Sequence, residues 1–128
     1  MAKQDDISIG AIEWHDLTVP NAEEIQRFYQ QVVGWQSQGQ SMGDYEDYNM
    51  VFPDSDTAAA GICHARGVNA SLPAQWLMYV RVVNVTQSIK TCEEMGGKLL
   101  SGPTAFGKQH YCVIQDPAGA VLALISEK

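Results

Sequence analysis

The feature that most constrains how this chain can fold is an internal repeat at a distance of 63 residues. Near the N-terminus a strand-like stretch is followed by an amphipathic helix predicted over Ala22–Val33, with Asn21 at its N-cap and Gly34 at its C-terminal stop. Adding 63 to the cap and stop positions gives Asn84 and Gly97, two residues of the same types. Both Asn side chains are expected to accept a bond from a backbone N–H of the first helical turn.

The two halves of the chain, residues 13–65 and 76–128, align without a gap. The alignment matches Tyr48 with Tyr111 and Ala60 with Ala123, besides the cap and stop residues. Positions dictated by the backbone are the ones that a repeated fold must keep. The repeat therefore predicts two copies of a strand–helix–strand–strand–strand unit.

Local patterns place the elements of each copy along the chain. In the first copy we expect a strand over residues 7–19, the helix over 22–33 and a loop or poorly marked strand over 36–44. A strand over 45–52, a turn over 53–56 and a strand over 57–65 follow. Residues 66–75 form a connector. In the second copy we expect a strand over residues 76–83 and a helix that begins after Asn84. A short strand over 98–100, a loop over 101–109, a strand over 109–115, a turn over 116–119 and a last strand over 120–126 follow.

Length, charge and cysteine content limit the classes of protein. A chain of 128 residues is expected to form a single domain. Its eight basic and fifteen acidic side chains give a net charge of −7, which argues against nucleic acid or an anionic membrane as the main partner. Three cysteines without CxxC spacing, together with the lack of a signal-like or membrane-spanning apolar stretch, predict a cytoplasmic protein.

Four short motifs, in this order, resemble the vicinal oxygen chelate superfamily of glyoxalases, bleomycin-resistance proteins and extradiol dioxygenases. They are Phe28-Tyr29, Gly34-Trp35, Gly96-Gly97 and the turn Asp116-Pro117-Ala118-Gly119. The resemblance implies an α+β fold in which two tandem βαβββ modules, about 7–65 and 76–128, form a cupped, barrel-like mixed sheet around a cavity. It also implies a homodimer and, in the metal-dependent members, a divalent cation that binds two adjacent substrate oxygens.

The resemblance also implies where a metal would be held. The family takes one ligand, usually His, from the first strand of each module and one, usually Glu, from the last strand. In this chain those positions are Trp14 or His15, Leu77 or Met78, Ala60, and Ala123. At best one of the four is a plausible ligand, whereas a catalytic site normally needs about three. We therefore expect no metal and no other cofactor, with a divalent metal at relocated ligands as the alternative.

Candidate site residues follow from the same strands. His15 is a candidate general base, with Glu13 on the same strand face; the alternative is a hydrogen-bonded packing histidine. His64 is expected at the surface. Four further residues are candidate ligand contacts, although aromatic strand residues are more often core: Trp14, Tyr48, Met78 and Tyr111.

Three functions remain open at this point. The first is a protein of the bleomycin-resistance type that binds a small molecule between the modules without metal chemistry. The second is a divergent lyase, isomerase or dioxygenase of the same superfamily, with a relocated metal or a metal-free acid–base site. The third is a protein-interaction module that keeps only the fold.

Overall fold

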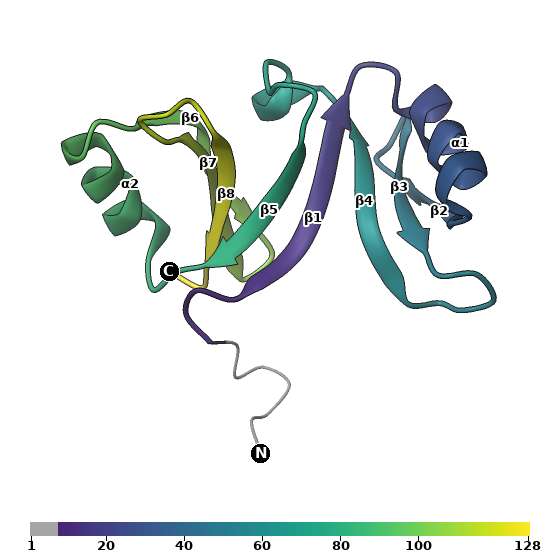
Figure 1. Cartoon of the computed structure of the whole chain (residues 1–128), viewed down its shortest axis with the longest axis horizontal. Helices are drawn as coiled ribbons and strands as arrows, with labels where there is room; N and C mark the ends of the chain where they lie inside the picture. The colour runs from purple at the N-terminus through teal and green to yellow at the C-terminus, as the bar shows by residue number, and fades with distance from the viewer. Residues whose placement is uncertain (1–7) are drawn as a thin grey trace. The chain divides into compact units, whose positions relative to one another are not determined.

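The chain divides into two compact units in a computed structural model that describes residues 8–128 (Figure 1). We name them module one, Trp14–Trp76, and module two, residues 8–13 together with Leu77–Lys128. Each is built from one helix and a mixed sheet of four strands. The α+β class and the two βαβββ units predicted from the repeat are confirmed. No helix in this described part of the chain is long and apolar enough to cross a membrane.

Module one is a three-stranded antiparallel meander with a fourth strand added in parallel. Its elements are β1 (Ile12–Val19, of which residues 12 and 13 belong to module two), α1 (Ala22–Val33), β2 (Gln36–Ser41), β3 (Glu46–Val51), β4 (Ala58–His64) and the short 3₁₀ helix η1 (Gly67–Asn69). The strand order is β2-β3-β4-β1, and β1 runs parallel to β4. The stretch left open as a loop or a strand is therefore a strand, β2.

Module two repeats this topology with β5-β8-β7-β6. Its elements are β5 (Trp76–Arg81, with Trp76 in module one), α2 (Val85–Glu94), β6 (Lys98–Phe106), β7 (Gln109–Gln115) and β8 (Val121–Ser126). The loop expected over 101–109 is wrong, because β6 continues to Phe106. Its glycines and proline predict a loop, but pairing with β7 decides, and two register shifts between Leu99 and Thr104 accommodate the irregular backbone.

The helix ends follow the expected chemistry at three of four places. Gly34 adopts the left-handed conformation, with φ of 93°, and its N–H bonds to the Gln30 carbonyl. Asn84 accepts a bond of 3.1 Å from the Gln87 backbone N–H, and Gly96 (φ 95°) follows the last turn of α2. The capping bond expected at Asn21 is wrong: its φ and ψ of −110° and 50° are not those of an extended cap, and its side chain instead donates to Glu24 at 3.2 Å.

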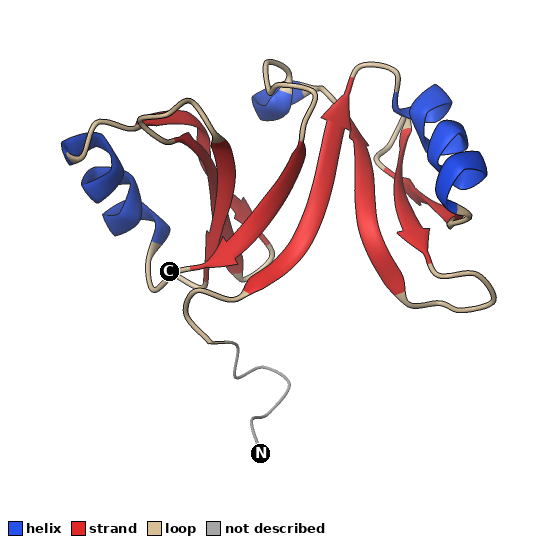
Figure 2. Cartoon of the chain, in the orientation of Figure 1, coloured by secondary structure: helices blue, strands red, loops and turns tan. Residues whose placement is uncertain are grey.

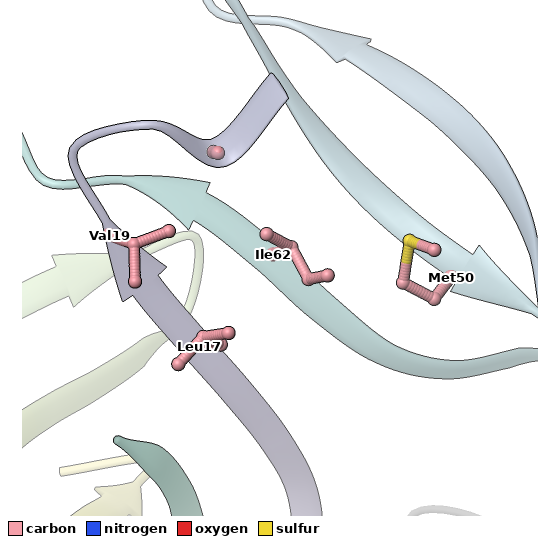
Figure 3. Close-up of a cluster of buried hydrophobic side chains, with 5 residues drawn as sticks. Leu17, Val19, Met50 and Ile62 are labelled. Atoms are coloured by element: carbon pink, nitrogen blue, oxygen red, sulfur yellow. The ribbon is translucent and has the colours of Figure 1, made fainter. Parts of the chain in front are cut away.

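Each helix covers one face of its own sheet (Figure 2). In module one the core lies between α1 and the sheet, where Leu17, Val19, Met50 and Ile62 come together (Figure 3). In module two the corresponding core is built on Val85, Cys112 and Leu124. Burial of these apolar faces accounts for the amphipathic pattern of both helices.

The repeat is not gapless, which corrects the alignment made from sequence. In module one Leu17 pairs with Ile62, but in module two the residue 63 positions after Leu17, Val80, pairs with Leu124 and not with Ile125. The hairpins themselves keep the offset of 63, since Tyr48 pairs with Ile62 and Tyr111 with Ile125, each 14 positions away. The shift of one residue therefore lies in how β4 and β8 pair with the first strand of each module.

A shift of one residue on each strand moves its side chains to the other face of the sheet. The ladder of β3 and β4 is also irregular between Met50 and Val51. Tyr48 therefore lies on the side of α1, next to the module-one core, while Tyr111 lies on the face away from α2 and contacts Tyr79. The same holds for Ala60, which faces α1, and Ala123, which faces away from α2.

Candidate functional site

We call the face of each sheet that points away from its own helix the helix-free face. Of the ligand positions that the resemblance implies, Trp14, Leu77 and Ala123 lie on this face by strand alternation. Ala60 faces α1, and its neighbour Gly61 takes the place on the helix-free face of module one. An indole N–H only donates, and the other three side chains have no donor atom for a cation. These residues do not fit a divalent metal. Across residues 8–128, no group of three or more His, Cys, Asp or Glu side chains is arranged to hold one.

The helix-free face of module one carries a carboxylate laid across a glycine. Asp16 of β1 pairs with Gly61 of β4, and a Cβ at position 61 would overlap the Asp16 carboxylate. The same Cβ would lie 3.5 Å from the Trp14 ring. Glycine at position 61 thus lets the carboxylate and the indole lie against the backbone of the strand.

Cys63 connects this carboxylate to a second one. Its thiol lies 3.7 Å from Asp16 Oδ1 and also interacts with Asp47 of β3. Burial, with the two negative charges beside it, raises the pKa of the Cys63 thiol far above its usual range. The thiol therefore stays protonated and donates a hydrogen bond; it does not act as a nucleophile at neutral pH.

Asp47 holds the last residue of β4. Its Oδ1 accepts the backbone N–H of His64 at 2.8 Å and lies 3.3 Å from Nδ1 of the same imidazole. The side chains of Asp47 and His64 are only 15% and 16% exposed, so the surface position expected for His64 is wrong. The rings of Tyr45 and Tyr48 pack against the imidazole, with centroids 5.4 and 6.3 Å away. Burial, followed by the nearby Glu23 and Glu46 carboxylates, raises the pKa of Tyr48.

The polar residues of module two form a closed network instead. Arg81 is 8% exposed and binds the Glu13 carboxylate through two nitrogens, at 2.5 and 2.8 Å. Its third contact is Gln109 Oε1 at 2.7 Å. The hydrogen bonds that Arg81 donates to Glu13 raise the pKa of Arg81, so the guanidinium remains charged. A cavity of about 260 Å³ beside it is lined by Ile9, Arg81, Val82, Val83, Gln109, Glu127 and Lys128.

An aromatic groove lies at the start of α1, on the helix side of module one. Trp76 donates from Nε1 to the Tyr29 hydroxyl at 3.1 Å, and the two rings meet edge to face with centroids 5.3 Å apart. The groove has a volume of about 420 Å³. Leu17 and Val19, which form its floor, also belong to the core of the module, so the groove is continuous with the packed interior.

The structure distributes the predicted site residues over different environments. Trp14 lies beside Asp16 and Gly61, while Tyr48 contacts His64 from the α1 side. Glu13 forms an ion pair with Arg81, and His15 is exposed on the strand face that also carries Leu17. Among the remaining two, Met78 is 39% exposed on the α2 side and Tyr111 contacts Tyr79.

Sequence reasoning did not single out Asp16, Asp47 or Gly61. Asp16 could have been found, because it alternates with Trp14 on a correctly predicted strand. Asp47 could not, because its contact with His64 joins residues 17 positions apart and depends on the register of β3 against β4.

Comparisons with known proteins agree with this topology. The family model of the Glyoxalase/Bleomycin resistance protein/Dioxygenase superfamily matches residues 9–124. A solved superfamily member from Vibrio splendidus 12B01 is 13% identical, with 91% of this chain and 99% of that chain covered and a TM-score of 0.58. A methylmalonyl-CoA epimerase solved in complex with methylmalonyl-CoA and NH4+ is 12% identical over 93% and 95%, with a TM-score of 0.53. The methylmalonyl-CoA epimerase from Mycobacterium tuberculosis is 15% identical over 98% and 92%, also at 0.53. The search of curated proteins found no match.

Proposed function

Because the chain belongs to the Glyoxalase/Bleomycin resistance protein/Dioxygenase superfamily, we propose that it binds a small organic molecule without the help of a metal, on the helix-free face of module one. The observation that carries the proposal is the Asp16 carboxylate lying over Gly61 beside the Trp14 ring. A carboxylate only accepts hydrogen bonds, and an indole offers a flat apolar surface. The ligand class that fits is a flat ring bearing an amidine, amine or hydroxyl group.

The neighbouring groups favour the same kind of ligand. Cys63 keeps its proton and donates toward Asp16, while Asp47 adds a second negative charge on the other side of the thiol. Two carboxylates near one neutral thiol attract a cationic or donor-rich molecule more than an anion. A hydrogen bond to a charged group contributes about 1.5–3 kcal/mol when its partner is present.

The metal-independent part of the proposal rests on donor chemistry. The residues on the helix-free faces at the implied ligand positions are Trp14, Leu77 and Ala123, with Gly61 beside the implied position Ala60, and none of them offers a ligand atom to a hard cation. One similar structure was solved with methylmalonyl-CoA, which supports a small-molecule ligand for this fold. We further propose a cytoplasmic homodimer without a nucleic-acid or membrane partner, consistent with the net charge of −7.

Benzamidine is a suitable probe, since it joins a flat ring to a charged donor group. In a ¹H–¹⁵N NMR titration we expect it to shift the resonances of Gly61, Cys63 and the Trp14 indole N–H. Asp16→Asn should weaken binding about 10-fold or more. The matched control is Asp54→Asn, which removes a carboxylate from an exposed turn and should leave affinity unchanged.

The same titration in the presence and absence of EDTA tests the metal. Affinity should not change with the chelator, nor rise on adding Zn²⁺, Ni²⁺ or Mn²⁺. Binding that is lost with EDTA, or equal weakening by the two Asp→Asn variants, would overturn the proposal. Light scattering of the same samples measures the oligomeric state, and a monomer would contradict the proposed homodimer.

A further inference from the structure

The three histidines of the chain differ in what their ring nitrogens contact. His15 is exposed on β1, and no contact of its ring is seen within residues 8–128. The Nδ1 atom of His110 is buried and lacks a hydrogen-bond partner among the described atoms. His64 alone of the three places a ring nitrogen next to a carboxylate, with Nδ1 3.3 Å from Asp47.

This contact determines which nitrogen of His64 carries the proton. The Asp47 carboxylate can only accept, and its Oδ1 already receives the His64 backbone N–H at 2.8 Å. The ring must therefore donate from Nδ1, and in the neutral imidazole the lone pair then lies on Nε2. Two bonds from one residue to one carboxylate oxygen fix the ring as well as the tautomer.

We propose that Nε2 of His64 is a proton acceptor, with Asp47 as its positioning residue, and that module one transfers protons to and from a bound small molecule with an acidic O–H, N–H or C–H group. In the forward step the ligand's bond to hydrogen breaks, its electron pair stays on the ligand, and the proton forms an N–H bond at Nε2. Asp47 stabilises the resulting imidazolium. In the reverse step the same proton returns, so no oxidant or reductant is needed.

Cys63, whose thiol interacts with both Asp16 and Asp47, connects Asp47 to the proposed ligand face, while the His64 ring lies with Tyr48 toward the α1 side. The elements around His64 carry further charged residues. Asp47 and Glu46 come from β3 and Asp16 from the neighbouring β1. Arg66 lies over the Tyr45 ring at 3.9 Å and is 3.7 Å from Asp44, which offsets its charge. Tyr45 and Tyr48 complete the surroundings of the ring.

Long-range ¹H–¹⁵N NMR of the ligand-free chain tests the tautomer directly, with His64→Gln to assign the signals. His64 should be found with its proton on Nδ1, in contrast to the exposed His15 in the same spectrum. Asp47→Ala should release this preference. If that variant folds poorly, Asp47→Asn keeps an oxygen that can accept the backbone N–H and should retain the tautomer. A His64 ring protonated at Nε2 in the unmodified chain would overturn the inference.

Acylation by diethyl pyrocarbonate tests whether Nε2 can act. The reagent's carbonyl carbon bonds to an unprotonated imidazole nitrogen with release of CO2 and ethanol, and peptide mass spectrometry separates the three histidines. We expect His64 to be acylated, at a rate that falls about 10-fold in Asp47→Ala and Asp47→Asn. An unmodified His64 in a sample whose His15 is fully acylated would contradict the inference.

The inference rests on the proposed function only for the bound molecule, and the two can fail separately. If His64 shows the other tautomer but benzamidine still binds, the proton-transfer inference is wrong and the proposed binding site stands. The expected tautomer and acylation, with benzamidine failing to bind, would keep the acid–base pair and reject the ligand class.

Discussion

The two modules share a topology but differ in what they place on their helix-free faces. In module one Asp16 and Asp47 flank a protonated thiol, and one of these carboxylates fixes a histidine. In module two the buried carboxylate of Glu13 is bound through both oxygens by Arg81, which is itself held by Gln109. The first arrangement brings two carboxylates close to one thiol, while the second pairs a carboxylate with a guanidinium. The proposed function therefore places the ligand on module one, and we expect the ion pair of module two to stabilise the fold.

The largest effect should come from breaking the ion pair of module two. Glu13→Ala leaves the Arg81 guanidinium buried without its carboxylate, and removing one partner of a buried pair costs about 3–5 kcal/mol. The double variant Glu13→Leu with Arg81→Met removes both charges and should be markedly less destabilising. Urea denaturation measures both. If Glu13→Ala cost no more than a surface substitution, the pair would not be a structural feature, and the contrast between the modules would be lost.

The second prediction tests the one-residue shift between the modules. Leu124 is 6% exposed in the core under α2, where it takes the place that Ile62 has under α1. Leu124→Ala and Ile62→Ala should each lower the free energy of unfolding by about 2–5 kcal/mol. Ile125 lies on the helix-free face, so Ile125→Ala should lower the free energy of unfolding by about half as much or less. A larger loss for Ile125 than for Leu124 would restore the gapless alignment.

How much of the fold the sequence predicts depends on whether the signal is local. The helix over Ala22–Val33, the turn at Asp116 and the cap at Asn84 were predicted, because each depends on residues a few positions apart. The extension of β6 to Phe106 and the actual role of Asn21 were missed. In the first case pairing with β7 overrides a loop-like composition, and in the second the backbone enters the helix in a non-capping conformation.

The candidate site was less accessible to sequence reasoning for the same cause. Identical residues suggested that Tyr48 and Tyr111 are equivalent, and they do occupy the same place in their hairpins. The pairing of β4 with β1 and of β8 with β5 differs by one residue, however, so the two tyrosines lie on opposite faces relative to the helices. His64 was expected at the surface because its contact with Asp47 is invisible without the register of β3. Trp14 was identified, since it needs only the alternation of one strand.

A third, smaller effect should come from filling the space under the Asp16 carboxylate. Gly61→Ala places a methyl group where Asp16 now lies, and the resulting displacement should cost about 1–3 kcal/mol. In the Asp16→Ala background the same substitution should cost much less, because the overlapping atoms are gone. A double-mutant cycle by urea denaturation measures the coupling. Additive costs would show that Gly61 is required for another reason, and the helix-free face of module one would lose its defining contact.

The smallest expected effect separates the buried thiols of the two modules by pH. Burial, together with Cys92, raises the pKa of Cys112 from 9.0 to about 11. The unfolded chain loses this proton near its ordinary pKa while the folded chain keeps it. The contribution of Cys112 to stability is therefore complete below about pH 9 and lost as the pH rises toward 11. The loss should be on the order of 1–2 kcal/mol.

Urea denaturation from about pH 8, below the ordinary thiol pKa of 9.0, up to the raised pKa of about 11 should show stability falling with pH. Cys112→Ala should flatten this decline, and since slopes are compared, the small cavity it leaves does not affect the result. Cys63→Ala should flatten the decline in stability more than Cys112→Ala does, because burial beside Asp16 and Asp47 raises the pKa of Cys63 more than that of Cys112. Tyr48, whose pKa is also raised, adds to the decline in all variants. Equal slopes for the two cysteine variants would mean that the carboxylates of module one do not act on Cys63, and the electrostatic difference between the modules would have to be given up.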